Sequence, residues 1–165
     1  MTLSEQSAIL VEAIEDELLQ PEDLVRWSDR IIESMDKPPT WLIELSTNGS
    51  PYLVDFASRL REHASPTLSL HCQIQIVILA HEAGLLSLPA SLQQLFRVTI
   101  CERGGRQLDA LDERLADTLV EWRCQDDLDV IEPPLLAKFG ALFREYLTSA
   151  GDIAAILPWK FERAA

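Results

Sequence analysis

The chain combines a formal net charge of −13 with a hydrophobic content of 47%, and this pairing restricts what it can fold into. High net charge leads to disorder only when hydrophobicity is also low, because such a chain has too little apolar surface to bury. Here the apolar residues suffice for a core, so the excess carboxylates must lie outside a folded body. At 165 residues the chain has the usual length of one domain, and we expect a single acidic domain over residues 1–165.

Apolar residues recur at intervals of three and four along most of the chain, which is the spacing of an amphipathic helix. Ser4 is suited to cap a first helix, and Pro21, followed by two acidic residues, is typical of a helix start. A last long helix should open at Pro133 and bury one face. We therefore predict an all-α fold, a multi-helix bundle of about seven helices joined by short loops that Pro and Gly mark.

The stretch over residues 68–76 fits two kinds of secondary structure. Apolar and polar residues alternate there, which is strand spacing, yet Leu70, Ile74 and Ile78 also fit one face of a helix. A lone strand would leave its backbone groups unpaired, because no other segment offers it a partner. We predict a helix over residues 70–83, and expect it to be the most buried one because this stretch carries the least charge.

The acidity is concentrated in two blocks. Residues 1–40 hold ten acids and three bases, and residues 109–132 hold nine acids and two bases, so each block carries −7. A field of this sign favours a basic protein partner, because complementary charges speed encounter and reject wrong partners. It disfavours nucleic acid, whose phosphates bind clustered Lys and Arg.

The chain shows no sign of membrane insertion or export. No apolar run approaches the roughly 18 residues that cross a bilayer as a helix. The first residues, Met1 to Glu5, lack the basic and apolar regions of a signal peptide. We expect a cytoplasmic protein with no membrane partner.

Histidine and cysteine residues do not form a familiar metal or catalytic motif. The three cysteines include no CxxC pair, and His81-Glu82 lacks the second His of HExxH. His71 and His81 lie ten residues apart, about 15 Å along a helix axis, so one metal cannot take both directly. The sequence therefore predicts no catalytic residue, no metal site, no cofactor and no structural disulfide.

Two other segments carry weak suggestions of ligand binding. The acids between Asp126 and Glu132 invite a calcium interpretation, but the glycine that an EF-hand loop needs is missing. The glycines between Arg103 and Arg106 lack the Lys-Ser/Thr of a phosphate-binding loop. A solvated loop and a helix stop explain these two segments better.

The tryptophans divide by position. Trp27 and Trp122 fall at core positions of helices, whereas Trp41 lies beside prolines on a short segment, where an aromatic is often half exposed. Tryptophan is enriched among residues that dominate binding energy, although a core role is the alternative. Together with acids of the two blocks, Trp41 completes the predicted partner-binding set: Glu12, Glu15, Asp16, Glu17, Trp41, Asp112, Asp117, Asp126, Asp127 and Asp129.

Two segments carry a resemblance to other proteins. Residues 23–32, DLVRWSDRII, and residues 38–46, PPTWLIELS, resemble small bacterial helical proteins of uncharacterised function. Some small acidic helical proteins of this type are immunity proteins, which bind and block a basic toxin. The resemblance implies an interaction protein and no catalytic residues.

Three functions follow as hypotheses. The leading one is a non-enzymatic, immunity-like or adaptor-like interaction protein that meets a basic protein through its acidic blocks. The second is a structural domain whose charge only keeps it dissolved. The third is a small-ligand binder or enzyme that uses His71, His81 and Glu82 in a central region.

Overall fold

The computed structural model describes residues 1–47, 52–65, 68–101, 108–125, 128 and 130–157. Within these ranges the secondary structure consists of nine α-helices and one π-helical segment, with no strand. The predicted all-α fold is confirmed. The helices outnumber the expected seven because residues 40–47 and 151–156 form short helices of their own.

The chain divides into two compact units. One unit is formed by Met1–Leu68 together with the chain from Asp152 onward, and the other by Ser69–Gly151. The expectation of a single domain over residues 1–165 stays a prediction.

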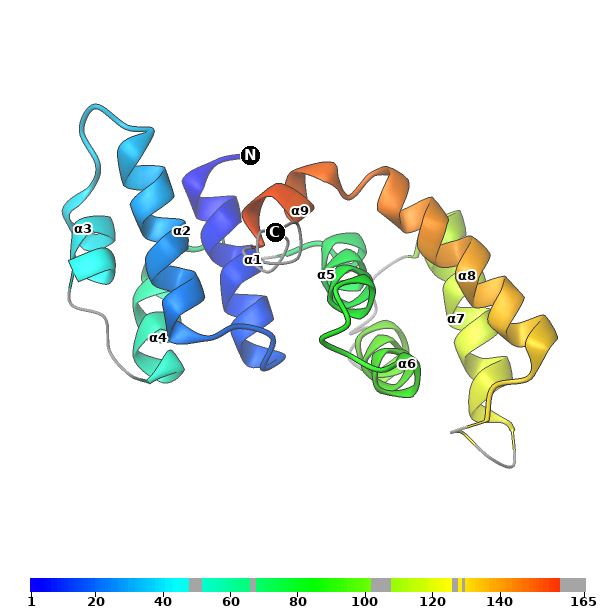
Figure 1. Ribbon diagram of the computed structural model, residues 1–165. Coiled ribbons are helices and arrows are strands. Elements are labelled where there is room, and N and C mark those ends of the chain that lie inside the picture. The colour runs from blue at the N-terminus through cyan, green and yellow to red at the C-terminus, as the bar shows by residue number, and fades with distance from the viewer. Residues whose placement is uncertain (48–51, 66–67, 102–107, 126–127, 129, 158–165) are drawn as a thin grey trace. The chain divides into compact units, whose positions relative to one another are not determined.

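The first unit contains α1 (Leu3–Glu15), α2 (Pro21–Glu33), α3 (Thr40–Thr47), α4 (Leu53–His63) and α9 (Gly151–Ile156), which opens at the boundary between the units (Figure 1). Helix α4 contacts both α1 and α2, and α2 contacts α3. The apolar faces of these helices supply the buried residues of this unit, which include Ile9, Leu10, Leu24, Trp27, Leu42, Leu45, Phe56 and Leu60.

The helix ends of the first unit differ in detail from the sequence prediction. Thr2, rather than Ser4, caps α1, since its side chain accepts from the backbone of Glu5 while the Glu5 carboxylate accepts from Thr2. The backbone hydrogen bond from Thr2 is the main cause that lowers the pKa of Glu5. Helix α2 begins at Pro21 as predicted.

The second unit contains α5 (Leu70–Glu82), α6 (Leu88–Phe96), a π-helical segment (Arg97–Cys101), α7 (Ala110–Arg123) and α8 (Pro133–Thr148). Helices α7 and α8 lie side by side, and α5 contacts α6, α8 and the π-helical segment (Figure 1). Their apolar faces form one core cluster, which includes Ile74, Val77, Ile78, Leu95, Leu115, Leu119, Trp122, Phe139, Leu142 and Tyr146.

Helix α5 resolves the ambiguity at residues 68–76 in favour of the helix. Ser69 caps it, because the Ser69 hydroxyl accepts from the backbone of Cys72. Every residue from Ile74 to Ala80 is buried, more than in any other described helix, since neighbours cover α5 on several sides. The alternation of apolar and polar residues at 68–76 therefore belongs to a helix that neighbours cover on several sides, and not to a strand.

Helix α6 leads directly into the π-helical segment. Helix α6 begins at Leu88 because Ser87 supplies a capping hydroxyl and Pro89 fits the first turn. The chain then widens into the π-helical segment up to Cys101, where the described range stops.

Candidate functional site

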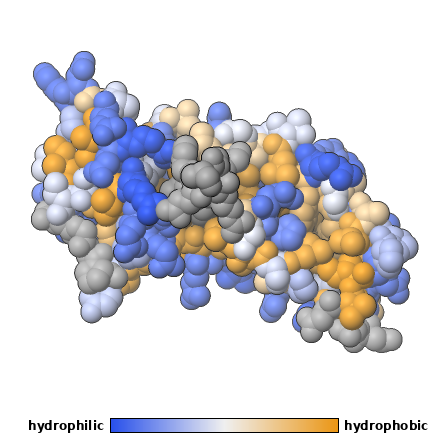
Figure 2. Space-filling view, in the orientation of Figure 1, coloured by the Kyte–Doolittle hydropathy of each residue, from blue (hydrophilic) through white to orange (hydrophobic). Residues whose placement is uncertain are grey.

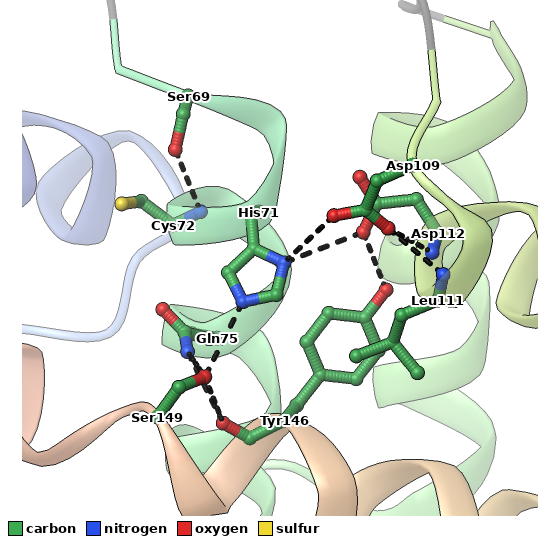
Figure 3. Close-up of polar contacts among 9 residues, drawn as sticks. All are labelled: Ser69, His71, Cys72, Gln75, Asp109, Leu111, Asp112, Tyr146 and Ser149. Carbon is green, nitrogen blue, oxygen red and sulfur yellow. Dashed lines mark hydrogen bonds and ion pairs between the residues drawn. The ribbon is translucent and has the colours of Figure 1, made fainter.

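One polar cluster lies among the helices of the second unit (Figure 3). His71 stands in the first turn of α5, Asp109 and Asp112 stand at the start of α7, and Tyr146 comes from α8. The His71 and Tyr146 rings pack against each other with centroids 5.0 Å apart. Three helices that are distant in sequence thus bring together an imidazole, two carboxylates and a phenol.

Asp109 uses one of its two carboxylate oxygens to cap α7. Its Oδ1 accepts from the backbone N–H groups of Leu111 at 2.9 Å and Asp112 at 2.8 Å. The other oxygen, Oδ2, lies 3.8 Å from Nδ1 of His71. The cap therefore orients the Asp109 side chain while one oxygen still faces the imidazole.

Asp112 is a buried carboxylate, only 4% exposed. Its Oδ1 accepts from the phenol of Tyr146 at 2.6 Å and lies 3.5 Å from Nδ1 of His71. Burial and, after it, this hydrogen bond raise the pKa of Tyr146, so the phenol keeps its proton and remains a donor. Asp112 is thereby held at the centre of the cluster.

The far side of the His71 ring is fixed by a second set of contacts. Nε2 of His71 lies 3.4 Å from the hydroxyl of Ser149. The buried amide of Gln75 donates to this hydroxyl at 2.9 Å and to the backbone carbonyl of Tyr146 at 3.1 Å. Gln75 therefore ties α5 to the end of α8 and holds Ser149 against the imidazole.

The cluster has the composition and spacing of a cation site. One ligand atom each from His71, Asp109 and Asp112 lies within 4.8 Å of the other two. The side chain of Asp112 is enclosed, whereas those of His71 and Asp109 are 30% and 59% exposed, so the cluster is open to water on one side. Within the part of the chain that the structure describes, these three residues are the ones that could hold a metal ion together.

The hypothesis of a site formed by His71, His81 and Glu82 finds no support in the positions of the last two. Nδ1 of His81 lies 3.1 Å from the carbonyl of Leu86, and the ring contacts the edge of Phe143. Glu82 is exposed. Neither residue joins the group around His71.

Most of the acids predicted in the first block are engaged with other groups. Glu15 forms an ion pair with Arg61 of α4. Glu12 and Asp16 are half-buried and interact with other groups. Glu17 is exposed, in a left-handed backbone conformation with φ of 58° after the end of α1. Only part of this block is therefore exposed and not in an ion pair with another described residue.

The second predicted block is also altered by the structure. Asp112 is buried and bonded to Tyr146, which corrects its expected place on an acidic contact surface. Asp117 is exposed on α7, as a contact residue must be. The remaining members of this block, Asp126, Asp127 and Asp129, lie outside the described residues.

The predicted aromatic contact residue is half-buried. Trp41, at the start of α3, stacks on the ring of His63 from α4, with centroids 4.3 Å apart and planes 13° from parallel. This contact joins α3 to α4. The predicted core positions of Trp27 and Trp122 are confirmed, since both are buried.

Sequence reasoning missed the cluster because its members are far apart along the chain. The sequence did contain an indication that Asp112 is buried. Leu115 follows it by three residues and Leu119 by seven, so Asp112 lies on the apolar face of its helix. An acid on a buried face needs a partner, and Tyr146 is that partner. No comparable signal marked His71 or Ser149.

Comparisons of the chain with protein-family models, with curated proteins and with solved structures give no match. The resemblance to immunity-like proteins therefore stays a prediction. Within the described ranges, no helix has the length and apolar content that crossing a bilayer requires.

Proposed function

We propose that the protein is a non-enzymatic interaction protein, immunity-like or adaptor-like, which binds a basic protein partner in the cytoplasm through an acidic surface on α7. The proposal rests on two exposed carboxylates, Glu113 and Asp117, which stand one helical turn apart. Neither forms an ion pair with another described residue. They are available to an external cation.

The cations near this face are already engaged. Arg114 binds Glu145 of α8 at 2.8 Å, and Lys138 of α8 binds Glu121 at 2.6 Å. Arg123 lies over the ring of Phe96, 5.8 Å from its centroid. These three positive side chains of α7 and α8 therefore serve contacts between helices and do not pair with Glu113 or Asp117.

Two like charges one turn apart destabilise an isolated helix by about 0.2–0.5 kcal/mol. A basic partner relieves this repulsion, so part of the cost in the free protein returns as binding energy. Val120, one turn beyond Asp117, is 46% exposed and adds apolar surface next to the charges. Apolar contact beside a charged rim is the usual composition of a protein interface.

The first unit supports the same role less well. Its ion pairs Glu15–Arg61 and Glu44–Arg59 compensate part of its acidity internally. Figure 2 shows hydrophilic and apolar side chains mixed over the face in view. We therefore place the contact on α7.

Association kinetics test the proposal. The partner is first captured from the source cell with the wild-type chain, and its association rate is then measured at low and high salt. Replacing Glu113→Gln and Asp117→Asn together should slow association and flatten its dependence on salt, because charges at the rim act mainly on the encounter rate.

The matched control removes two exposed carboxylates from the first unit, Glu33→Gln with Asp36→Asn. It changes the net charge equally and should leave the association rate close to that of the wild type. An acidic partner, a rate that ignores salt, or equal slowing by both double variants would contradict the proposal.

A further inference from the structure

The hydrogen bonds around Ser149 bear on which nitrogen of His71 carries the proton. The Ser149 hydroxyl donates to the carbonyl of Tyr146 at 3.2 Å and accepts from the amide of Gln75. A hydroxyl has one proton, so when Ser149 gives it to the Tyr146 carbonyl, its oxygen accepts from Nε2 of His71, 3.4 Å away. This arrangement favours the tautomer with the proton on Nε2 and a lone pair on Nδ1.

In this tautomer the lone pair of Nδ1 points at two carboxylates. Nδ1 is enclosed and has no hydrogen-bond partner among the described residues. The oxygens that face it belong to Asp112, at 3.5 Å, and Asp109, at 3.8 Å. A charge-assisted hydrogen bond would bring such atoms to roughly 2.7–2.9 Å. Both distances from Nδ1 to these oxygens are therefore longer than a charge-assisted hydrogen bond.

We propose that His71, Asp109 and Asp112 bind one divalent transition-metal ion of the zinc or manganese class. Bonds of about 2.0–2.2 Å to one such ion place neighbouring ligand atoms roughly 3.0–3.5 Å apart. The observed separations from Nδ1, 3.5 and 3.8 Å, need only a small closure, which the exposed side chain of Asp109 can supply. With the ion bound, Nδ1 of His71 and one oxygen each of Asp109 and Asp112 would all bind a positive charge instead of repelling one another.

The donor set selects the class of metal. Imidazole nitrogen suits zinc and the other transition metals, whereas calcium and magnesium prefer sites made of oxygen ligands alone. Two carboxylates neutralise the charge of a divalent ion, and the side open to water leaves room for further ligands. A site of one nitrogen and two carboxylate oxygens therefore favours Zn²⁺ or Mn²⁺ over Ca²⁺ or Mg²⁺.

Each of the three ligands is already oriented by a neighbour. The Tyr146 phenol donates to Asp112, the backbone at the start of α7 donates to Asp109, and Ser149 stands at Nε2 of His71. Outer contacts of this kind hold metal ligands in position and raise affinity. The inference is independent of the proposed partner surface, because it rests on other residues of α7.

The test is a titration of the full chain with Zn²⁺ and with Mn²⁺, followed by calorimetry, with Mg²⁺ as the comparison ion. The decisive variant is Asp109→Asn, because asparagine is as good a helix cap as aspartate but a poor metal ligand. His71→Gln is the second variant. Controls are Asp117→Asn, exposed on the same helix, and His63→Gln, which lies in the other unit.

The cysteines require a separate readout, because Cys72 is adjacent to His71, and Cys101 and Cys124 are exposed. Co²⁺ distinguishes the two kinds of ligand by its absorption spectrum. Bonds to thiolate give a strong near-ultraviolet charge-transfer band, whereas bonds to imidazole and carboxylate give only weak visible bands. The proposed site predicts the visible bands without the charge-transfer band.

We expect one Zn²⁺ or Mn²⁺ per chain, an increase in melting temperature with metal, and binding at least about tenfold weaker in both ligand variants. The two controls should bind as the wild type does. Failure of the wild type to bind either ion, unchanged affinity in Asp109→Asn, or a thiolate band with Co²⁺ would overturn the proposal. If His71→Gln does not fold, Asp109→Asn decides the question.

Discussion

The phenol of Tyr146 donates a hydrogen bond to Oδ1 of Asp112 across 2.6 Å, and so joins α8 to α7 within the core of the second unit. Both side chains are buried. A buried carboxylate is costly unless it is hydrogen-bonded, and this phenol is its strongest described donor. The pair therefore fixes how α7 and α8 meet at this point.

Replacing Tyr146→Phe should lower the free energy of unfolding by about 1–3 kcal/mol, because the ring is kept while Asp112 loses its donor. Chemical denaturation followed by circular dichroism measures this loss. Tyr52→Phe is the control, since Tyr52 is 66% exposed, and its effect should stay within about 0.5 kcal/mol. Equal effects at the two tyrosines would show that the buried bond contributes nothing.

The same phenol should make stability decline in alkali. The pKa of Tyr146 in the folded chain lies above its ordinary value of 10.0, so above that pH the unfolded chain loses a proton that the folded chain retains. This contribution is fully present below pH 10.0 and is lost as the pH rises further. Unfolding free energies measured from neutral to alkaline pH should therefore fall less steeply in Tyr146→Phe than in the wild type.

The centre of α5 should be sensitive to truncation. Ile78 is fully buried in the core cluster, so Ile78→Ala should cost about 2–5 kcal/mol through lost contacts and a residual cavity. Val120→Ala, at an exposed position, is the comparison and should change stability by less than about 0.5 kcal/mol. A cost below about 1 kcal/mol at Ile78 would mean that α5 is not central to its unit.

Removing the repulsion on α7 should stabilise the free protein slightly. Asp117→Asn relieves the like-charge pair with Glu113 and should raise the unfolding free energy by about 0.2–0.5 kcal/mol at low salt. The gain should shrink at high salt, where exposed charges are screened. Thermal melts at two salt concentrations measure it, with Glu82→Gln as the control. A gain that persists at high salt would need a cause other than repulsion.

The fold class was predictable because it depends on short-range patterns. Helical spacing and Pro21 at a helix start act within a few turns of chain, and a comparison of all segments was enough to show that residues 68–76 have no strand partner. Helix ends were less predictable, since Thr2 and Ser4 are both good caps and only the bond to Glu5 decides between them.

The cluster around His71 could not be read from the sequence. His71 and Asp112 belong to different helices, and their approach depends on how α5, α7 and α8 pack. Asp112 lies in an acidic block, where local reasoning placed it on the surface. Its position on the apolar face of α7 was the one local indication of burial.

The first unit is interrupted in sequence by the whole of the second. Helix α9 belongs with the N-terminal helices, and the backbone carbonyl of Ile156 accepts a hydrogen bond from Arg30 of α2. During synthesis on the ribosome, the segment Ser69–Gly151 is therefore complete before α9 emerges. The second unit, which is continuous in sequence, can therefore form its core first. The first unit can complete its core only after α9 has been synthesised.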